Sequence, residues 1–321
     1  MPKEIPVYLF TGFLESGKTT FLQELFEEEG FNIGERTLLL LCEEGEVDYD
    51  PSRFFDSRDV LIKRVEEEGD LTHTNLATLR AQGNASRVVI EWNGMWDLNQ
   101  LDDNMPRGWI IYQQMMFADS RTFLLYNNNL RQQTFDQMKG ADLVVFNRCE
   151  RNSMFKDWQQ EVHKICRVAN RNNQIVYEFG ADDVLVDDIE DPLPYDMTKK
   201  LLNIKEEYYA EWYRDLTENQ DDYQNKEVFV KGMAVIGDEL APDEMIFGRH
   251  VMTCCEADIA FAGYLCKADP EMINGLKNGD WVDILAEVRN EYTTMYGEVG
   301  PVFYCSKIEK TTPCDPEVAT F

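Results

Sequence analysis

Short apolar runs alternate with longer stretches of mixed polarity through the first half of the chain. Strands covered by helices on both faces are apolar at every position, whereas surface helices repeat their apolar residues every three to four positions. The runs predict buried strands at residues 7–11, 37–41, 60–62, 88–90, 109–112, 143–146 and 174–177. Helices are predicted from residue 18 onward and at residues 71–82, 130–139 and 155–169. This alternation predicts an α/β domain with a mostly parallel sheet, which binds ligands where its strands end.

The pattern changes near residue 182, where an acidic segment with Pro192 and Pro194 discourages helix formation. A helix is predicted at 206–217, and its aromatic stripe indicates packing on the next domain. From residue 226 short strands alternate with turns, which predicts a small β-rich domain, an OB-like barrel. Gly232 lies within the first of these strands and predicts a bulge or bend. The strands are predicted at residues 228–235, 247–253, 260–267, 281–288 and 302–308.

Two domains are therefore predicted, in keeping with the length of 321 residues. The α/β domain is assigned to residues 1–185 and the β-rich domain to residues 226–310. An acidic linker and the aromatic-faced helix lie between them at 186–225. Residues 311–321 are predicted to form a polar tail, in which Cys314 has no assigned role.

The turn between the first strand and the first helix carries the pattern G-x-x-x-x-G-K-[ST], from Gly12 to Thr19. Gly12 and Gly17 permit backbone angles that turn consecutive amides toward an anion. The helix that follows presents its first amides to the same place. Lys18 would reach the terminal phosphates of a nucleotide, and the Thr19 hydroxyl would bind Mg²⁺. The alternative is a glycine-rich turn with a surface lysine, which the flanking strand and helix disfavour.

Polar residues follow the other predicted strands, at the edge of the sheet where ligands bind. An acidic loop at 42–50 follows one strand, and Glu91 and Gly94 follow another. Glu91 is suited to bind Mg²⁺ directly or through water, and Gly94 lets an amide approach a phosphate. Asp119 and the segment 147–150 lie in similar positions. Because strand ends are often polar merely where they meet solvent, the prediction rests on their joint placement.

Three segments are distinctive together: Gly12 to Leu22, Cys42-Glu43-Glu44-Gly45-Glu46-Val47 with Asp50, and Glu91-Trp92-Asn93-Gly94. They resemble the CobW-type GTPases, which belong to the wider group that holds the urease and hydrogenase nickel-insertion GTPases. The resemblance covers about the first 185 residues. It implies GTP binding with Mg²⁺ and slow GTP hydrolysis, coupled to metal delivery or metallocofactor assembly.

Carried onto this chain, the resemblance implies a role for each matching residue. Thr19 and Glu91 are the expected Mg²⁺ ligands. Lys18 would neutralise phosphate charge, and Glu43 or Glu46 would orient the attacking water, so these three are the catalytic candidates. The nucleotide-binding candidates are Gly12, Glu15, Ser16, Gly17, Lys18, Thr19, Thr20, Gly94, Asn147, Arg148 and Glu150.

One departure from the family pattern concerns the base. Asn147-Arg148-Cys149-Glu150 stands where the family has Asn-Lys-x-Asp. Asn147 would still meet the base edge, and Arg148 would stack over the purine as the lysine stem does. Glu150 keeps the carboxylate that pairs with the N–H donors of guanine, but it is one methylene longer. A preference for guanine is therefore expected, and the variant segment leaves open whether that preference over ATP is strict or relaxed.

A second departure concerns metal. The family carries a Cys-x-Cys-Cys motif after the second strand, whereas residues 65–71 contain no cysteine here. Thiolates select Zn²⁺ or Cu⁺, so the usual transition-metal site is missing from this place. Cys42, Glu43 and Glu46 remain candidate ligands. The alternative is an acidic loop that is only solvated.

The chain is strongly acidic, with 31 Lys and Arg against 60 Asp and Glu and a formal net charge of −29. Such a surface repels phosphate backbones, which argues against nucleic acid and anionic membranes as partners. The sequence shows no secretory signal and no apolar run of about 18 residues, which predicts a cytoplasmic protein without membrane insertion. Its 8 cysteines are then expected as reduced core residues, metal ligands or redox groups.

Three segments of the second half are distinctive: Phe229-Val230-Lys231-Gly232, the block from Arg249 to Asp258, and Gly279-Asp280-Trp281-Val282. Together they resemble the C-terminal region of the DUF1980 family, over about residues 195–310. That family accompanies a predicted membrane permease and resembles genes linked to zinc limitation in bacteria. It defines no biochemical role for this region.

A candidate zinc site lies inside that block. Cys254 and Cys255, with His250 and Asp258, offer sulfur, nitrogen and oxygen donors in one short segment, a set that Zn²⁺ accepts. The alternative is strong, because free cysteines are commonly buried hydrophobes and adjacent side chains on a strand point to opposite faces.

Three functions remain open from the sequence. The first is a GTPase in metal homeostasis, with Zn²⁺ as the metal and a metalloprotein client as the partner. The second is a nucleotide-gated interaction protein that docks on a membrane permease and holds no metal beyond Mg²⁺. The third is a P-loop kinase for a small molecule, which the lack of an arginine-rich stretch over the phosphates disfavours. A homo-oligomer is compatible with each.

Overall fold

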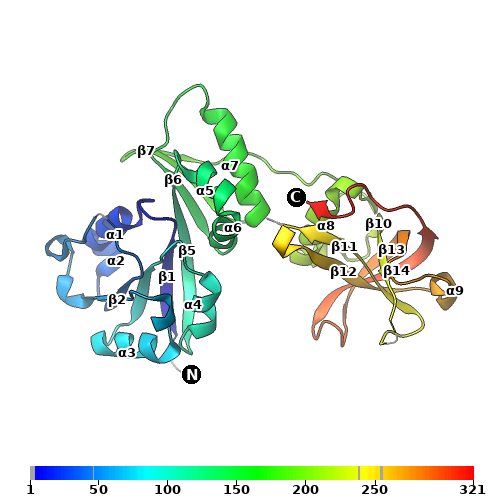
Figure 1. Ribbon diagram of the computed structural model, residues 1–321, viewed down its shortest axis with the longest axis horizontal. Coiled ribbons are helices and arrows are strands. Elements are labelled where there is room, and N and C mark those ends of the chain that lie inside the picture. Colours follow the sequence, from blue (N-terminus) through cyan, green and yellow to red (C-terminus); the bar gives the residue numbers. More distant parts are fainter. Residues whose placement is uncertain (1–3, 46, 238, 254–255) are drawn as a thin grey trace. The chain divides into compact units, whose positions relative to one another are not determined.

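The computed structural model describes residues 4–45, 47–237, 239–253 and 256–321. The chain divides into two compact units, Met1–Ile189 and Glu190–Phe321. Figure 1 colours the first unit from blue to green and the second from green to red. The division falls close to residue 185, where the composition predicts the end of the first domain.

An eight-stranded sheet forms the centre of the first unit, in the order β3-β2-β4-β1-β5-β6-β7-β8. Neighbouring strands are parallel except β7 and β8, which are antiparallel. The predicted α/β domain with a mostly parallel sheet is confirmed. The strands are β1 (Ile5–Thr11), β2 (Thr37–Leu41), β3 (Val60–Arg64), β4 (Arg87–Glu91), β5 (Trp109–Asp119), β6 (Leu143–Asn147), β7 (Gln174–Gly180) and β8 (Asp183–Val186).

Helices cover both faces of this sheet, and β2 shows why its residues are apolar throughout. Leu39 and Leu41 pack with α1 on one face, while Leu38 and Leu40 pack with α3 and α4 on the other. Figure 1 shows α1 and α4 on opposite sides of the strands. The helices are α1 (Lys18–Glu27), α2 (Glu29–Asn32), α3 (His73–Gly83), α4 (Leu98–Asn104), α5 (Phe123–Asn129), α6 (Arg131–Lys139) and α7 (Phe155–Ala169), with 3₁₀ turns η1 (Pro51–Arg53), η2 (Ser57–Asp59) and η3 (Glu68–Asp70).

The start of the predicted acidic linker belongs to the first unit. β8 pairs with β7, and Asp187 follows it with a buried side chain. The Asp187 carboxylate accepts a hydrogen bond from the Tyr177 hydroxyl at 2.8 Å and lies 2.8 Å from Nδ1 of His163. The carboxylate is satisfied within the unit, so the connecting segment begins after it.

The second unit is built on a closed β-barrel. Its strands run in the order β11-β12-β14-β13-β10, and β10 pairs with β11 to close the ring. β12 and β14 are parallel, and the other barrel pairs are antiparallel. This is the OB-like arrangement that the short strands predict. The strands are β9 (Leu201–Asn203), β10 (Glu227–Val235), β11 (Glu244–Met252), β12 (Ala260–Lys267), β13 (Trp281–Tyr292), β14 (Val299–Lys310) and β15 (Ala319–Thr320).

The aromatic-faced helix packs on the barrel. Tyr209, Trp212 and Leu216 of α8 are buried in the same apolar cluster as the strands, because they share one side of the helix. The helical elements of this unit are η4 (Glu206–Tyr208), α8 (Tyr209–Glu218), η5 (Gln220–Tyr223), η6 (Glu256–Asp258) and α9 (Pro270–Ile273).

Two expectations for the second unit differ from the structure. Residues 311–321 are not a free tail, because β15 pairs with β11 and Cys314 is buried. Gly232 marks no bulge, since it stays in register with Val282. A Cβ on Gly232 would lie 2.7 Å from the Phe247 ring, so close packing across the barrel requires the glycine.

Within the described ranges, no helix combines the length and the apolarity that crossing a bilayer requires.

Candidate functional site

The loop between β1 and α1 is shaped by residues with positive φ. Gly12 has φ 133° and Gly17 has φ 99°, and Glu15 between them has φ 61°. A Cβ on Gly12 would lie 2.2 Å from the Phe117 carbonyl oxygen, so only glycine fits there. The loop therefore takes the form that turns backbone amides toward an anion.

Lys18 lies inside this loop, with 2% of its side chain exposed. Its ammonium group donates to the carbonyl oxygens of Gly12 at 2.8 Å and Phe13 at 3.0 Å. The third contact is an ion pair with Oε2 of Glu43, at 2.7 Å. A side-chain carboxylate from the loop after β2 thus supplies the anion at the lysine.

The predicted Mg²⁺ ligands lie together. The Thr19 hydroxyl donates to Oε1 of Glu91 at 2.5 Å. The other oxygen of Glu91 accepts a hydrogen bond from the Tyr49 hydroxyl at 2.8 Å. Burial and the Glu91 charge raise the pKa of Tyr49 far above its ordinary value, so it stays a donor. Tyr49 connects the acidic loop to the Mg²⁺ candidates, and no motif in the sequence identifies it.

Gly94 lies against the phosphate loop. A Cβ on it would lie 2.5 Å from the Gly12 carbonyl oxygen and 2.8 Å from the Phe13 Cα. The Gly94 carbonyl accepts a hydrogen bond from Nε2 of Gln137, at 3.1 Å. Gln137 lies on α6 and is buried, so it holds the loop after β4 in place from the α6 side. The sequence predicts a role for Gly94, whereas no pattern in it identifies Gln137.

Asn147 and Arg148 contact the same loop from the end of β6. Nδ2 of Asn147 donates to the Ser16 carbonyl at 2.5 Å. Arg148 has φ 54°, and its guanidinium donates to the Glu15 carbonyl at 2.9 Å and to Asp119 at 2.7 Å. Arg148 is therefore held by the phosphate loop and a carboxylate.

Asp119 is the carboxylate that pairs with Arg148 and Arg121. Hydrogen bonds from Arg121 and from Arg148 hold its pKa at about 2. The carboxylate is therefore ionised at every physiological pH, and it pairs with both arginines.

Two cavities that share Gly17, Thr20 and Arg148 lie along the phosphate loop. The first, of about 180 Å³, is lined by the loop together with Glu43 and Glu91. The second, of about 470 Å³, lies beside Asn147 and the end of β7. Because they adjoin, they suit a ligand with a charged tail and a flat head.

Glu150 lines neither of these two cavities. It lines a third cavity, of about 220 Å³, together with Phe155 and Trp158 of α7. Its carboxylate accepts a hydrogen bond from Asn152 at 3.5 Å. It is not among the residues that line the cavity beside Asn147.

The polar atoms of the loop fit a magnesium nucleotide. The Ser16 hydroxyl and Oδ1 of Asn147 are buried and lack a hydrogen-bond partner in the part of the chain that the structure describes. Unsatisfied buried polar atoms are costly unless a ligand or water satisfies them. The Ser16 hydroxyl and the buried Lys18 suit phosphate. The Thr19–Glu91 pair suits Mg²⁺, and Oδ1 of Asn147 suits a base.

The zinc candidates are only partly described. Glu46, Cys254 and Cys255 lie outside the described residues. Among the rest, the Asp258 carboxylate accepts from the Thr253 amide at 3.1 Å, and His250 packs on the Phe261 ring. The described residues hold no cluster of three or more potential metal ligands.

Cys42, the thiol candidate of the acidic loop, is buried. Burial, with the charges of Glu91 and Glu43, raises its pKa to about 12. The thiol therefore keeps its proton at neutral pH.

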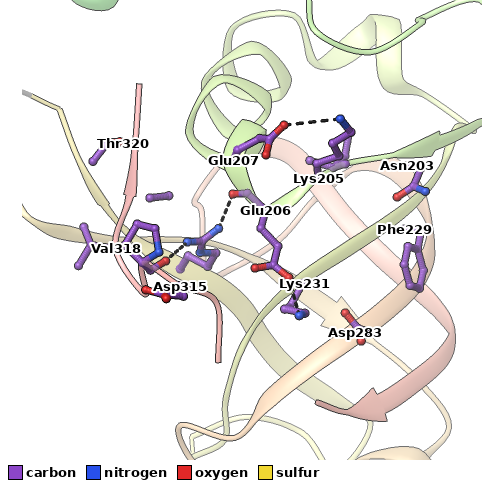
Figure 2. A pocket seen from close by; sticks show the side chains of 14 residues that line it. Asn203, Lys205, Glu206, Glu207, Phe229, Lys231, Asp283, Asp315, Val318 and Thr320 are labelled. Carbon is purple, nitrogen blue, oxygen red and sulfur yellow. Dashed lines mark hydrogen bonds and ion pairs between the residues drawn. The ribbon is translucent and has the colours of Figure 1, made fainter. Parts of the chain in front are cut away.

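The second unit holds a larger cavity, of about 620 Å³ (Figure 2). Two ion pairs lie among its lining residues: Lys231 contacts Glu206 at 2.5 Å, and Lys205 contacts Glu207 at 3.5 Å. The buried Arg249 lies in its wall. Asp283 and Asp315 also line the cavity, so its described lining mixes paired cations with carboxylates, and size alone does not identify the chemistry.

The two units match two family models. Residues 6–177 match the CobW/HypB/UreG nucleotide-binding domain, and residues 183–318 match the DUF1980 C-terminal domain. No curated protein matches the chain in sequence.

Similar solved structures include hydrogenase maturation factor HypB from Archaeoglobus fulgidus, with 14% identity and a TM-score of 0.37 over 55% of this chain and 81% of that one. Zn(II)-bound YjiA GTPase from E. coli has 16% identity and a TM-score of 0.39, over 81% of this chain and 89% of that one. Likeness at these scores carries no argument about function.

Proposed function

Because the chain belongs to the CobW/HypB/UreG family of P-loop GTPases, we propose that its first unit binds GTP with Mg²⁺ and hydrolyses it slowly to GDP and phosphate. The observation that carries this proposal is the Lys18–Glu43 ion pair inside the phosphate loop. A buried ammonium needs an anion, and Glu43 supplies one from a neighbouring loop.

In the proposed complex the terminal phosphates take the place of the Glu43 carboxylate at Lys18. The loop amides and the Ser16 hydroxyl donate to the phosphate oxygens. Thr19 and Glu91, already 2.5 Å apart, would hold Mg²⁺, which neutralises phosphate charge. Tyr49 keeps the Glu91 carboxylate oriented.

Glu43 has a second role in this proposal. Once released from Lys18 it remains beside the phosphate cavity that it lines, where it can orient a water molecule. Positioning and charge neutralisation supply most of the catalysis in phosphoryl transfer, so a strong general base is not required.

Slow turnover follows from the arginine that lines the phosphate cavity. Arg148 already donates to the Glu15 carbonyl and to Asp119. A guanidinium committed to these partners gives little stabilisation to charge that develops on the phosphate. Arginine contacts of that kind accelerate such reactions by about 10³–10⁵-fold, so a partner protein would have to provide one.

Phosphate release from GTP with Mg²⁺, measured on the full chain, tests this function. Lys18→Ala should lower the rate by about 100-fold or more, because no other cation reaches the phosphates from within the loop. Lys156→Ala, which removes an exposed lysine from α7, is the matched control and should behave like the wild type. Hydrolysis by Lys18→Ala at the wild-type rate would refute the assignment, and competition with ATP measures the base preference.

We propose further that the cycle serves metal homeostasis, with zinc as the first candidate. The membership of the first unit in the CobW/HypB/UreG family and the match of residues 183–318 to the DUF1980 C-terminal domain support this. Zinc measured by mass spectrometry in the purified chain should fall when Cys254 and Cys255 are both replaced by Ser. A zinc-free wild type would instead favour the nucleotide-gated interaction protein, whose permease or client would be sought by pull-down with GTP and with GDP.

A further inference from the structure

Two carboxylates lie near the ends of β6 and β7, and they border different cavities. Glu150 borders the cavity next to α7, with Phe155 and Trp158. Glu178 borders the cavity of about 470 Å³ next to the phosphate loop, with Asn147 and Phe21 of α1. The cavity that continues the phosphate site therefore contains Glu178 and not the carboxylate of the Asn-x-x-Glu segment.

The alternation of side chains along β7 explains the position of Glu178. Tyr177 is buried in the apolar cluster on the α7 side, and Phe179 packs against the same cluster. Because neighbouring side chains on a strand point to opposite faces, Glu178 points to the α1 side. There it meets Glu24 of α1, which lines the same cavity.

The loop after β6 is fixed to this strand. The Cys149 amide donates to the Glu178 carbonyl at 2.8 Å. Asn147, at the start of the loop, donates through Nδ2 to the Ser16 carbonyl at 2.5 Å. Hydrogen bonds to main-chain carbonyls thus hold Asn147 and Glu178 beside the same cavity in the absence of a ligand.

Both side chains present acceptors that lack donors. Oδ1 of Asn147 is buried without a partner, and the half-buried Glu178 carboxylate has no hydrogen bond or ion pair with another described residue. Burial and the charge of Glu24 raise the pKa of Glu178 above its ordinary value, which reflects a carboxylate without a cation. A ligand that brings N–H groups would satisfy them.

Guanine brings these groups in the required pattern. Its N1–H and 2-amino group are adjacent donors, which one carboxylate accepts together. Adenine presents one amino donor beside an acceptor nitrogen, which a carboxylate oxygen repels. Resting on the proposed GTP-binding function, we propose that Glu178 is the residue that selects guanine, in the role that the motif assigns to Glu150.

The test measures dissociation constants of the full chain for GTP, ATP and xanthosine triphosphate with Mg²⁺. Xanthine has a carbonyl in place of the 2-amino group of guanine. Glu178→Gln turns one acceptor into a donor, so GTP should bind at least about tenfold more weakly and xanthosine triphosphate at least about tenfold more tightly. Because the second change is a gain, it cannot arise from misfolding.

Glu150→Gln is the competing variant, since it makes the same change on the carboxylate that the motif nominates. Glu161→Gln, on an exposed position of α7, is the neutral control. A reversal of preference in Glu150→Gln, or an unchanged preference in Glu178→Gln, overturns the inference and leaves the proposed function standing. A wild-type chain that binds no purine triphosphate overturns both.

Discussion

Each unit buries a cation in the wall of a cavity, and the two cations have different partners. Lys18 bonds to two carbonyl oxygens and to the Glu43 carboxylate. Arg249 bonds to the carbonyl oxygens of Glu206, Pro316 and Glu317, and no described carboxylate lies within ion-pair distance of it.

This difference in partners distinguishes a cation that can bind a ligand from one that holds segments of the fold together. A cation whose anion is a side chain from a loop can exchange that anion for a ligand. A guanidinium whose donors are taken by main-chain carbonyls ties segments together and has little left to offer. The cavity at Lys18 measures about 180 Å³ and that at Arg249 about 620 Å³, so the partners of the cation are the better guide to function.

The largest expected effect tests the structural side of the comparison. Arg249→Leu removes a buried guanidinium that donates to three carbonyl oxygens, which should lower the free energy of unfolding of the second unit by about 3 kcal/mol or more. Lys18→Ala should cost less, because it removes the donor to two carbonyl oxygens instead of three. Urea unfolding followed by circular dichroism compares them. Equal stability of Arg249→Leu and the wild type would end the distinction between the two cations.

The next effect concerns how tightly the Lys18 site is built. Gly94→Ala places a Cβ 2.5 Å from the Gly12 carbonyl oxygen, which is main chain and cannot swing aside. The phosphate loop must shift, and GTP affinity should fall by about tenfold or more, with a smaller change in stability. Gly69→Ala is the matched control, because its Cβ meets no atom within 4 Å. Isothermal titration of both variants gives the comparison, and equal affinities would show that the loop tolerates displacement.

A smaller effect tests whether the anion at Lys18 is exchangeable. Glu43→Gln removes the charge that competes with the phosphates, so GTP should bind a few fold more tightly, by about 1 kcal/mol. Phosphate release should slow in the same variant if Glu43 also orients the water. Binding and turnover are measured on one preparation. Weaker GTP binding would mean that Glu43 assists the nucleotide instead of competing with it.

The sequence predicted the parts of this site that are encoded locally. The phosphate loop and its flanking strand and helix are adjacent in the chain, and their patterns are strong. Tyr49 and Gln137 were missed because they act on Glu91 and Gly94, which are 42 and 43 positions away. No local pattern records such contacts.

Some strands and helices were predicted incompletely or not at all, in part because local patterns do not record tertiary contacts. The strand predicted at 109–112 extends to Asp119 in β5, since Gln114 interrupts the apolar pattern. Gln114 is buried, and its side-chain amide donates to the main-chain carbonyl of Gln137 at 3.0 Å. A tertiary contact thus satisfies a polar residue that the pattern placed outside the strand. Helices α4 and α5 were also not predicted, because each has only seven residues, too few to show a helical repeat of apolar positions.

The smallest effect comes from a third pairing, in which the cations are exposed. The Arg148 and Arg121 side chains are 42% and 59% exposed, and they hold the pKa of Asp119 at about 2, below its ordinary value of 3.8. A lowered folded-state pKa contributes stability above about pH 4, and this contribution disappears as the pH falls toward 2. Because water screens these pairs, Asp119→Asn should cost less than about 1 kcal/mol at pH 7. Unfolding measured from pH 7 to pH 2 should show the wild type and the variant converging below pH 4. A constant difference would mean that the Asp119 charge contributes nothing, and that burial decides which ion pairs matter in this chain.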